Sequence, residues 1–146
     1  MVQIIVPERG LIPECAQIYA AAYQADPWNE ECCETDVENY LTAYLHSETK
    51  CCFAAVEDER IIGVALGLIV PSLTGPYLRI EDFCIHPSKQ RNGCGTAFLN
   101  LIEQEAQKHG CDSVLLGTQR NFPSHYFYLK NGFAEIESVL LYKEIE

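Results

Sequence analysis

Positive charge is scarce in this sequence. The 146 residues include 10 Lys and Arg against 21 Asp and Glu, which gives a formal net charge of −11 at pH 7. A protein that binds the phosphate backbone of a nucleic acid over a broad face carries an excess of positive charge. We therefore expect no nucleic-acid partner.

Long hydrophobic runs are also missing. The longest, Ile61 to Pro71, is too short to span a bilayer and is interrupted by Gly63 and Gly67. No basic stretch precedes an apolar one in residues 1–10, so no secretory signal is recognisable. These absences predict a cytoplasmic protein without a membrane partner.

The eight cysteines lack the spacing of a metal site or a disulfide framework. No C-x-x-C occurs, no His pair stands at ligand spacing, and the adjacent pairs Cys32 with Cys33 and Cys51 with Cys52 seldom bridge or chelate through both sulfurs. A chain of this length also buries enough apolar surface to fold without such links. We expect reduced thiols and no metal.

Hydrophobic residues make up 48% of the chain, and no repeat, linker or low-complexity tract interrupts it, so we expect a single globular domain over residues 1–146. The hydrophobic periodicity predicts strands and helices in the order β-α-α-β-β-β-α-β-α-β-β, an α/β fold. The predicted strands are Gln3–Val6, Cys51–Val56, Ile61–Val70, Tyr77–Ile85, Ser113–Gly117, Phe133–Glu135 and Val139–Lys143, and the predicted helices are Ile12–Tyr23, Thr35–Leu45, Thr96–His109 and Pro123–Asn131.

Two of these elements carry more specific expectations. Thr35 and Glu38 have the spacing of a capping box, which predicts the start of the second helix. The strand Ile61–Val70 is apolar on both faces, so it should lie in the middle of the sheet.

The strand Tyr77–Ile85 breaks its own alternation. Apolar residues stand at 78 and 80 and again at 83 and 85, so the period of two slips by one residue at Glu81 and Asp82. A β-bulge at this point would return all four apolar side chains to one face and re-aim the carboxylates. The alternative is a frayed strand with two solvated acids.

A glycine-rich segment, Gln90 to Thr96, opens the helix that follows. Helix N-termini present unpaired N–H groups and positive potential, and glycines allow a phosphate to approach the backbone closely. No acidic residue occurs from Phe83 to Ile102, whereas Lys89 and Arg91 do. The segment therefore predicts a pyrophosphate site. It lacks the Gly-Lys-Ser/Thr of a Walker loop and the third glycine of the dinucleotide fingerprint.

Two segments together resemble the GNAT superfamily of acetyl-CoA-dependent N-acetyltransferases. Gln90-Arg91-Asn92-Gly93-Cys94-Gly95 is similar to the family's Arg/Gln-x-x-Gly-x-Gly/Ala loop, and Ile85-His86-Pro87 precedes it as in the family. The later segment is similar to the family's Asn-x-x-Ala-x-x-x-Tyr-x-x-x-Gly-Phe, with serine in place of alanine; its matching residues are Asn121, Ser124, Tyr128, Gly132 and Phe133.

This resemblance implies a central mixed sheet, flanked by helices, whose fourth and fifth strands splay apart. It also implies direct transfer of an acetyl group, in a ternary complex, from acetyl-CoA to the primary amine of a cationic small molecule or a peptide. A non-catalytic acyl-CoA sensor or interaction module with the same fold is the alternative. The sequence leaves a homodimer open.

The resemblance also implies which residues hold the cofactor. Backbone groups of the strand end would pair with the pantetheine arm, the glycine-rich loop would bind the pyrophosphate, and Asn121 would contact the arm across the splay. The implied cofactor-binding residues are Phe83, Cys84, Ile85, Gln90, Arg91, Asn92, Gly93, Cys94, Gly95, Thr96, Asn121, Ser124 and Tyr128.

Acetyl transfer needs an acid for the leaving thiolate and a base for the amine. Tyr128 is the candidate acid because a phenol stays protonated at neutral pH. Tyr126 is the rival, and at two helical positions from Tyr128 it points to the opposite side. Glu81 at the expected bulge is the first candidate base, and Asp82 is the second.

The remaining candidates concern the acceptor and other chemistries. The acid-rich segment 26–38 is either a solvated loop or, with Trp28, Glu81 and Asp82, a lip that binds a cationic amine. Cys84 and Cys94 lack a base at recognisable spacing, which disfavours a thiol nucleophile. His86 and His125 are expected on the surface.

Overall fold

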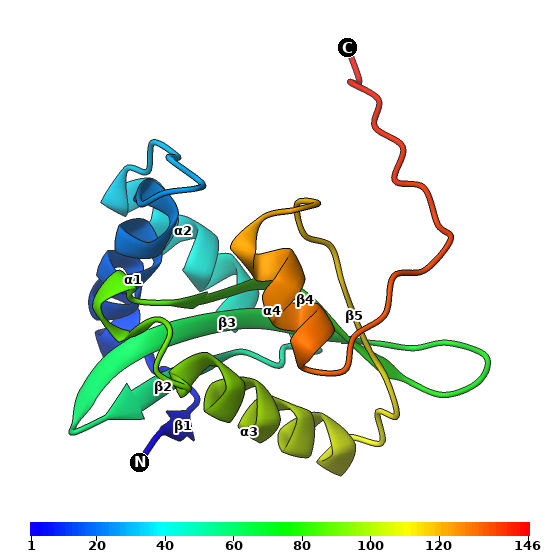
Figure 1. Cartoon of the computed structure of the whole chain (residues 1–146), viewed down its shortest axis with the longest axis horizontal. Helices are drawn as coiled ribbons and strands as arrows, with labels where there is room; N and C mark the ends of the chain where they lie inside the picture. The colour runs from blue at the N-terminus through cyan, green and yellow to red at the C-terminus, as the bar shows by residue number, and fades with distance from the viewer.

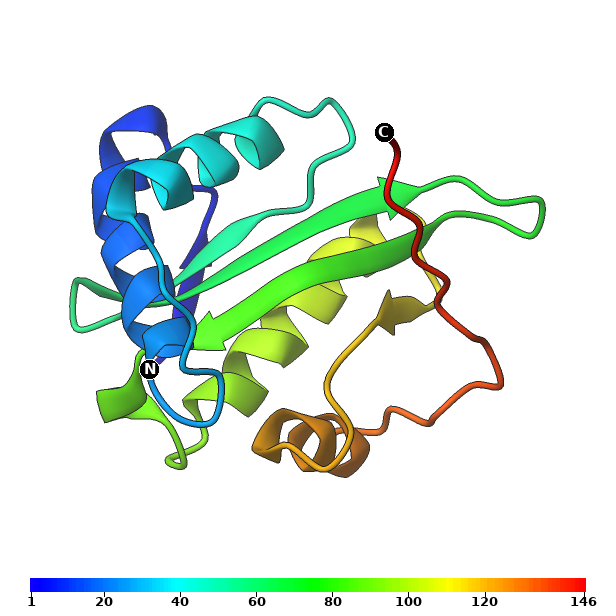
Figure 2. The ribbon, with the colours of Figure 1, turned by 90° about the horizontal axis from the view of Figure 1, so that it is seen from above.

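The computed structural model describes residues 1–146 and consists of one sheet with helices on both faces (Figures 1 and 2). None of the helices combines the length and the hydrophobicity that a membrane crossing needs. In chain order the elements are β1 (Gln3–Ile5), the 3-10 turn η1 (Arg9–Leu11), α1 (Ile12–Gln24), α2 (Glu34–Leu45), β2 (Phe53–Glu57), β3 (Arg60–Val70), β4 (Tyr77–Ile85), the 3-10 turn η2 (Pro87–Lys89), α3 (Cys94–Lys108), β5 (Val114–Leu116) and α4 (Pro123–Lys130).

The strands lie in the order β1-β2-β3-β4-β5, and every neighbouring pair is antiparallel except β4 with β5, which is parallel. The mixed sheet expected from the sequence is therefore confirmed. β3 occupies the centre, as its two apolar faces predicted. Its residues from Ile61 to Gly67 are all buried because helices cover both sides.

Two apolar layers enclose the sheet. α1 and α2 pack on one face, where Val37, Leu41 and Leu45 of α2 are buried. α3 packs on the other face and contributes Phe98 and Leu99, which are fully buried. The amphipathic pattern of each helix thus determines which face of the sheet it covers.

The bulge predicted in β4 is present. Leu66 of β3 pairs with Asp82 and Gly67 pairs with Ile80, which leaves Glu81 without a partner across the ladder. The extra residue restores the alternation, as expected. Consequently the four apolar side chains of β4 all contact the layer that contains α3; they are Leu78, Ile80, Phe83 and Ile85.

β4 and β5 separate soon after they meet. They pair only over Leu78–Ile80 and Val114–Leu116. Beyond Ile80 the chain that leaves β5 swings away from β4 toward α4 (Figure 2). This confirms the splay of the fourth and fifth strands, and it leaves the second half of β4 without a neighbour on that side.

The predicted capping box is wrong. α2 begins at Glu34, one residue earlier than expected, with Cys33 as its N-cap and no side-chain cap. Thr35 therefore lies inside the first turn, where its hydroxyl is past the capping position. Acidic side chains at Glu34 and Asp36 interact with the positive end of the helix dipole instead.

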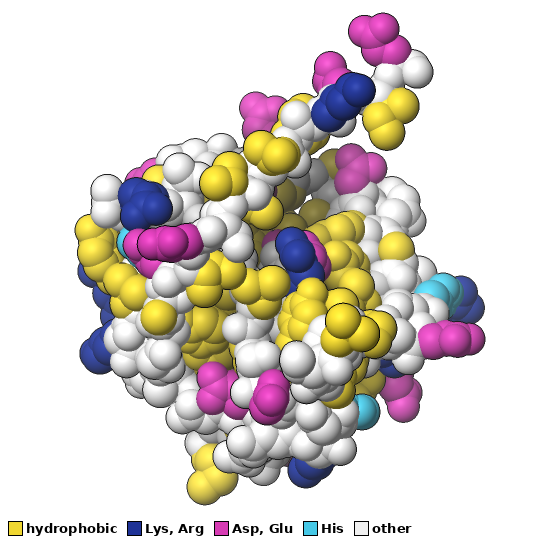
Figure 3. All heavy atoms as spheres, turned by 90° about the vertical axis from the view of Figure 1, so that its right-hand side faces the viewer, with side chains coloured by type: hydrophobic (Ala, Val, Ile, Leu, Met, Phe, Trp, Pro, Cys, Tyr) yellow, Lys and Arg dark blue, Asp and Glu magenta, His cyan; other side chains and the backbone are white.

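The two strands expected after α4 are also absent, and residues 131–146 contain no helix or strand. Glu135 forms an ion pair with Arg120 and contacts Nε2 of His125, so the chain leaves along the segment before α4 and not along the free edge of β5. The last residues project from the body (Figures 1 and 3). Val139 is 82% exposed and Leu141 is 91% exposed, because no second strand covers them.

The close pairing of β3 with β4 depends on Gly63. A Cβ at Gly63 would lie 2.7 Å from Ile85 Cδ1 and 2.8 Å from the Cys84 carbonyl oxygen. We predict that Gly63→Ala lowers the free energy of unfolding by about 1–3 kcal/mol, measured by urea denaturation. Gly10→Ala is the control, because a Cβ there has no atom within 4 Å. Equal stability of the two variants would contradict this packing.

Candidate functional site

A cleft of about 960 Å³ opens where β4 and β5 separate. Its walls come from the end of α1 and the loop after it, the second half of β4, the start of α3, the end of β5 and α4. Segments distant in sequence therefore meet around one hollow, and most of the predicted site residues line it.

The start of α3 presents a run of free backbone donors. The first bond of this helix runs from the N–H of Ala97 to the carbonyl of Gly93, at 3.1 Å. The N–H groups of residues 91–96 donate to no protein acceptor. Arg91, Gly93, Gly95 and Thr96 line the cleft. Free N–H groups at the positive end of a helix dipole form a site for an anion such as a pyrophosphate.

The backbone geometry explains why positions 93 and 95 are both glycine. Gly93 caps α3 with φ +87°, a left-handed conformation that other residues adopt only with strain. A Cβ at Gly95 would lie 3.1 Å from the Phe127 ring of α4. Together they allow the backbone to turn into α3 and allow α3 to approach α4 closely.

Gln90 has a structural contact that the sequence did not reveal. Its Nε2 donates to the carbonyl of Ile85 at 2.9 Å, which ties the loop to the end of β4. Lys89 forms an ion pair with Glu57 at 3.1 Å and is not in the cleft wall. Of the two cations near the loop, Arg91 alone faces the cleft.

The free side of β4 offers backbone groups to an extended ligand. The N–H of His86 donates to the carbonyl of Ile62 in β3. Because hydrogen-bonding directions alternate along an antiparallel ladder, Phe83 and Ile85 direct their backbone groups away from β3. Ile85 accepts from Gln90, so the amide of Phe83 remains available at the splay. An amide-containing chain could add there as an extra strand.

Three of the implied cofactor residues do not line the cleft: Asn92, Cys94 and Asn121. The Cys94 thiol is buried and contacts a Glu57 carboxylate oxygen at 3.7 Å. Asn92 is exposed. For these two residues the backbone N–H, and not the side chain, is the group available to a ligand at the start of α3.

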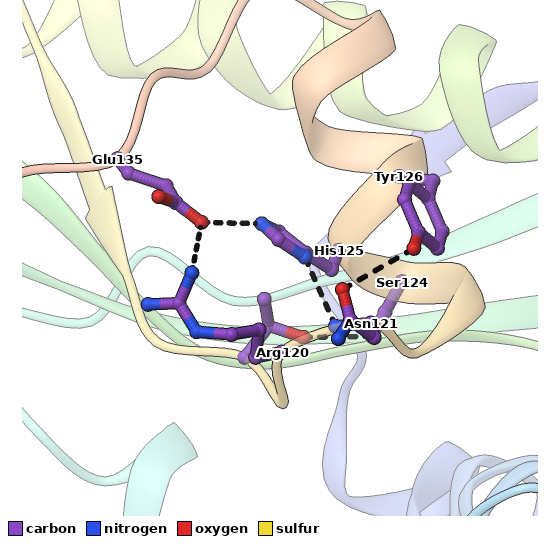
Figure 4. A network of polar contacts seen from close by, with 7 residues as sticks. Arg120, Asn121, Ser124, His125, Tyr126 and Glu135 are labelled. Atoms are coloured by element: carbon purple, nitrogen blue, oxygen red, sulfur yellow. Dashed lines mark hydrogen bonds and ion pairs between the residues drawn. The ribbon is translucent and has the colours of Figure 1, made fainter.

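Asn121 belongs to a separate polar network (Figure 4). Its Oδ1 accepts from the Tyr126 hydroxyl at 3.2 Å, and its N–H donates to Nδ1 of His125 at 3.1 Å. His125 Nε2 and Arg120 both contact Glu135, at 2.8 and 2.9 Å. The network holds the segment before α4, and it engages Asn121 with His125 and Tyr126 outside the cleft lining.

Asp82 lies in the cleft wall as a partly buried carboxylate. Its Oδ1 accepts from the Tyr19 hydroxyl at 3.2 Å, and its Oδ2 accepts from the Tyr40 hydroxyl. Burial raises the pKa of Asp82 above its ordinary range, and the hydrogen bonds from the tyrosines oppose this rise. Glu81, by contrast, has its carboxylate 2.5 Å from Nε of Arg79.

Acidic and aromatic residues form the wall on the side of α1. Trp28 packs edge-on against Tyr23 and Phe122, with ring centroids 5.8 and 5.0 Å apart. Asp26 and Glu30 flank it in the same wall. On the side of α3 and α4 the charged lining residues are Arg91 and Lys130. The cleft is therefore electrostatically divided, with negative charge on one side and positive charge on the other.

Tyr128 and Tyr126 point in different directions, as their spacing predicted. Tyr128 is buried, lines the cleft and packs edge-on against Phe133, with ring centroids 5.3 Å apart. Burial raises the pKa of Tyr128, so its hydroxyl stays protonated at neutral pH. Tyr126 is 57% exposed and is absent from the cleft wall.

All eight cysteines carry free thiols. Cys84 borders the cleft, and burial raises its pKa to about 12. Burial also raises the pKa of Cys94. Neither sulfur is a thiolate at neutral pH, which is the form that acts as a nucleophile.

Residues 12–133 match the acetyltransferase (GNAT) family, and the chain therefore belongs to this family. No curated protein matches its sequence. Acetyl-CoA is the usual acyl donor of the family. The cleft fits this group in three respects: the free N–H groups of residues 91–96, the unpaired edge of β4 and the glycines at the start of α3.

Solved structures share the fold at low sequence identity. A transcriptional regulator from Bacillus halodurans C-125 has 18% identity and a TM-score of 0.80, with 99% of this chain and 100% of that chain covered. A ribosomal-protein-alanine N-acetyltransferase from Brucella melitensis biovar Abortus 2308 has 16% identity and a TM-score of 0.79, with 99% and 100% covered. The aminoglycoside N-acetyltransferase AAC(6')-Iy in complex with CoA has 17% identity and a TM-score of 0.78, with 99% and 93% covered.

The burial of Asp82 has a measurable cost in stability. Because its pKa is raised in the folded state, the folded protein binds this proton more tightly than the unfolded chain does. Ionisation of Asp82 therefore lowers the free energy of unfolding as the pH rises above about 4. We predict that Asp82→Asn gains stability relative to the parent protein between pH 4 and pH 7, measured by urea denaturation. A difference that is independent of pH would contradict this.

Proposed function

We propose that this chain, as a single domain over residues 1–146, transfers an acetyl group from acetyl-CoA to the primary amine of a cationic small molecule. Transfer is direct, within a ternary complex. The observation that carries the proposal is the position of the free N–H groups at the start of α3: Arg91, Gly93, Gly95 and Thr96 line the same cleft as the partly buried carboxylate of Asp82. One cleft thus combines an anion site with a proton acceptor.

The chain's own groups suit each part of the donor. The N–H groups of residues 91–96, with Arg91, bind the pyrophosphate. Backbone groups of β4 at Phe83 pair with the pantetheine amides, and Ser124 lies in the opposite wall, where its hydroxyl is 2.7 Å from that of Thr118. When bound, acetyl-CoA supplies an activated thioester.

Two carboxylates border the acceptor side, and we assign them different roles. Amines arrive protonated, so a base must remove a proton before attack. Glu81 was the first candidate from sequence, but its carboxylate is engaged in an ion pair with Arg79. Asp82 has no cationic partner, and its raised pKa brings it nearer to neutrality, where a base is most effective. Asp82 is therefore our proton acceptor, and Glu81 helps to attract the cation.

The wall around Trp28 favours a cationic acceptor. An ammonium group binds over an aromatic face, and neighbouring carboxylates add attraction. Trp28, Asp26 and Glu30 provide both features beside the proton acceptor. A neutral substrate would gain only the apolar contact of the aromatic rings, and an acidic one would be repelled by the carboxylates.

Tyr128 is suited to protonate the leaving thiolate. Tyr128 lines the cleft, and its hydroxyl is protonated at neutral pH because burial raises its pKa. No nucleophilic thiolate faces the cleft at neutral pH, since the pKa of Cys84 is raised to about 12. Direct transfer thus needs only groups that are present in their reactive forms.

The anion site gives a binding prediction. Gly93→Val forces a β-branched residue into φ +87°, and Gly95→Val drives a side chain into the Phe127 ring. We expect both variants to lose at least 10-fold in acetyl-CoA affinity, measured by calorimetry, because the N–H groups lose their arrangement. Asn92→Ala is the control, since it leaves the backbone donors in place. Normal binding by both valine variants would place the pyrophosphate elsewhere.

Release of free thiol from acetyl-CoA, followed over a panel of mono- and polyamines, tests the activity itself. We expect turnover with polycationic amines. Tyr128→Phe should lower kcat by roughly 100-fold to 10,000-fold with little change in acetyl-CoA affinity, because it removes an acid and keeps the ring.

Tyr126→Phe is the matched control on the same helix and should keep its activity. A large loss of kcat in Tyr126→Phe, with normal kcat in Tyr128→Phe, would contradict the assignment of Tyr128 as the acid. Binding of acetyl-CoA without thiol release for any amine would instead favour a non-catalytic acyl-CoA sensor.

A further inference from the structure

The carboxylate of Asp82 is contacted by hydroxyl groups from two different helices. Tyr19 of α1 donates to one oxygen and Tyr40 of α2 donates to the other. Neither tyrosine lines the cleft, whereas Asp82 does. The two hydroxyls therefore lie behind the carboxylate as seen from the cleft.

This arrangement leaves the carboxylate free to act. Each carboxylate oxygen has two lone pairs, so two hydroxyl donors occupy half of the acceptor positions. The remaining positions can accept a proton from a ligand in the cleft. Because donors contact both oxygens, the carboxyl group also cannot rotate without losing a hydrogen bond.

We propose that Tyr19 and Tyr40 are positioning residues that keep the Asp82 carboxylate ionised and correctly oriented in the cleft wall. The catalytic consequence rests on the proposed function, in which Asp82 takes the proton of the amine. Hydrogen bonds to the charged form offset the desolvation that burial imposes on it. Without them, the pKa of Asp82 would rise further, and a smaller fraction of the carboxylate would be ionised at a given pH.

Among the other ionisable groups around Asp82, the hydroxyl of Tyr23 also lowers its pKa by hydrogen bonding, whereas the acidic groups do not. Glu81 is acidic and raises the pKa of Asp82, and the Cys84 thiol is neutral. Glu30 in the loop after α1 is acidic as well. The tyrosines that face this group are Tyr19 and Tyr23 of α1, Tyr40 and Tyr44 of α2, and Tyr128 of α4.

Tyr19→Phe and Tyr40→Phe remove one hydroxyl each and keep the packed ring. Tyr44→Phe is the matched control, because Tyr44 lies one turn from Tyr40 on α2, with ring centroids 5.3 Å apart, and forms no hydrogen bond with Asp82. Circular dichroism and thermal melting verify that each variant folds.

The direct measurement is an NMR titration of the Asp82 side-chain carboxyl carbon, assigned with Asp82→Asn. We expect its pKa to rise by about one unit in Tyr19→Phe and in Tyr40→Phe, and to stay unchanged in Tyr44→Phe. An unchanged pKa in both test variants would overturn the proposal. This readout needs no substrate, so it stands even if no amine is acetylated.

The pH profile of kcat/KM gives the catalytic readout. The acidic limb should move to higher pH by the same amount in the two test variants, and activity should recover on the alkaline side. A uniform loss of activity with an unmoved limb would show a purely structural role and would overturn the catalytic part. Absence of turnover in the parent protein, with the NMR shifts present, would reject the proposed function and leave the positioning role.

Discussion

Glu81 has no partner across the ladder between β3 and β4. Because of this one extra residue, each side chain that follows it in β4 points to the face of the sheet opposite to the one it would otherwise occupy. With strict alternation, Asp82 would share a face with Leu78 and Ile80 and would enter the layer built on α3, where the neighbours are apolar. A carboxylate there would have no hydrogen-bond donor, and its burial would be very costly. The bulge instead sends Asp82 toward α1 and α2, and it keeps Phe83 and Ile85 in the apolar layer.

The separation of β4 and β5 carries a second structural cost in the same region. β4 and β5 share only three residue pairs, and the N–H groups of residues 91–96 have no partner. Unpaired backbone donors are unfavourable when buried, so they persist only where solvent or a ligand can reach them. The charge of the chain is distributed to suit an anion at this point. Although the net charge is −11, no acidic residue occurs between Phe83 and Ile102, while acids gather on the opposite wall of the cleft.

Features encoded by neighbouring residues could be predicted from the sequence. The slip at Glu81 and the glycines before α3 are local patterns, and both were found where expected. The contacts of Asp82 are not local, since Tyr19 and Tyr40 are 63 and 42 residues away, so no spacing could reveal them. The end of the chain was mispredicted for a related reason. Its hydrophobicity favours strands, but Glu135 contacts Arg120 and His125, which lie in and before α4, and the chain beyond it pairs with no strand.

The tyrosines on α1 and α2 join packing to chemistry within one layer. Tyr19 and Tyr40 pack edge-on with ring centroids 6.0 Å apart, and this contact helps to hold α1 against α2. The ring of a tyrosine contributes apolar contact while its hydroxyl remains free to donate. The helix pair can therefore be held by the rings while the hydroxyls are used by Asp82. Because the two contributions come from different atoms, the same residues can pack the helix pair and donate to Asp82, which is how the fold retains a partly buried acid without a cationic partner.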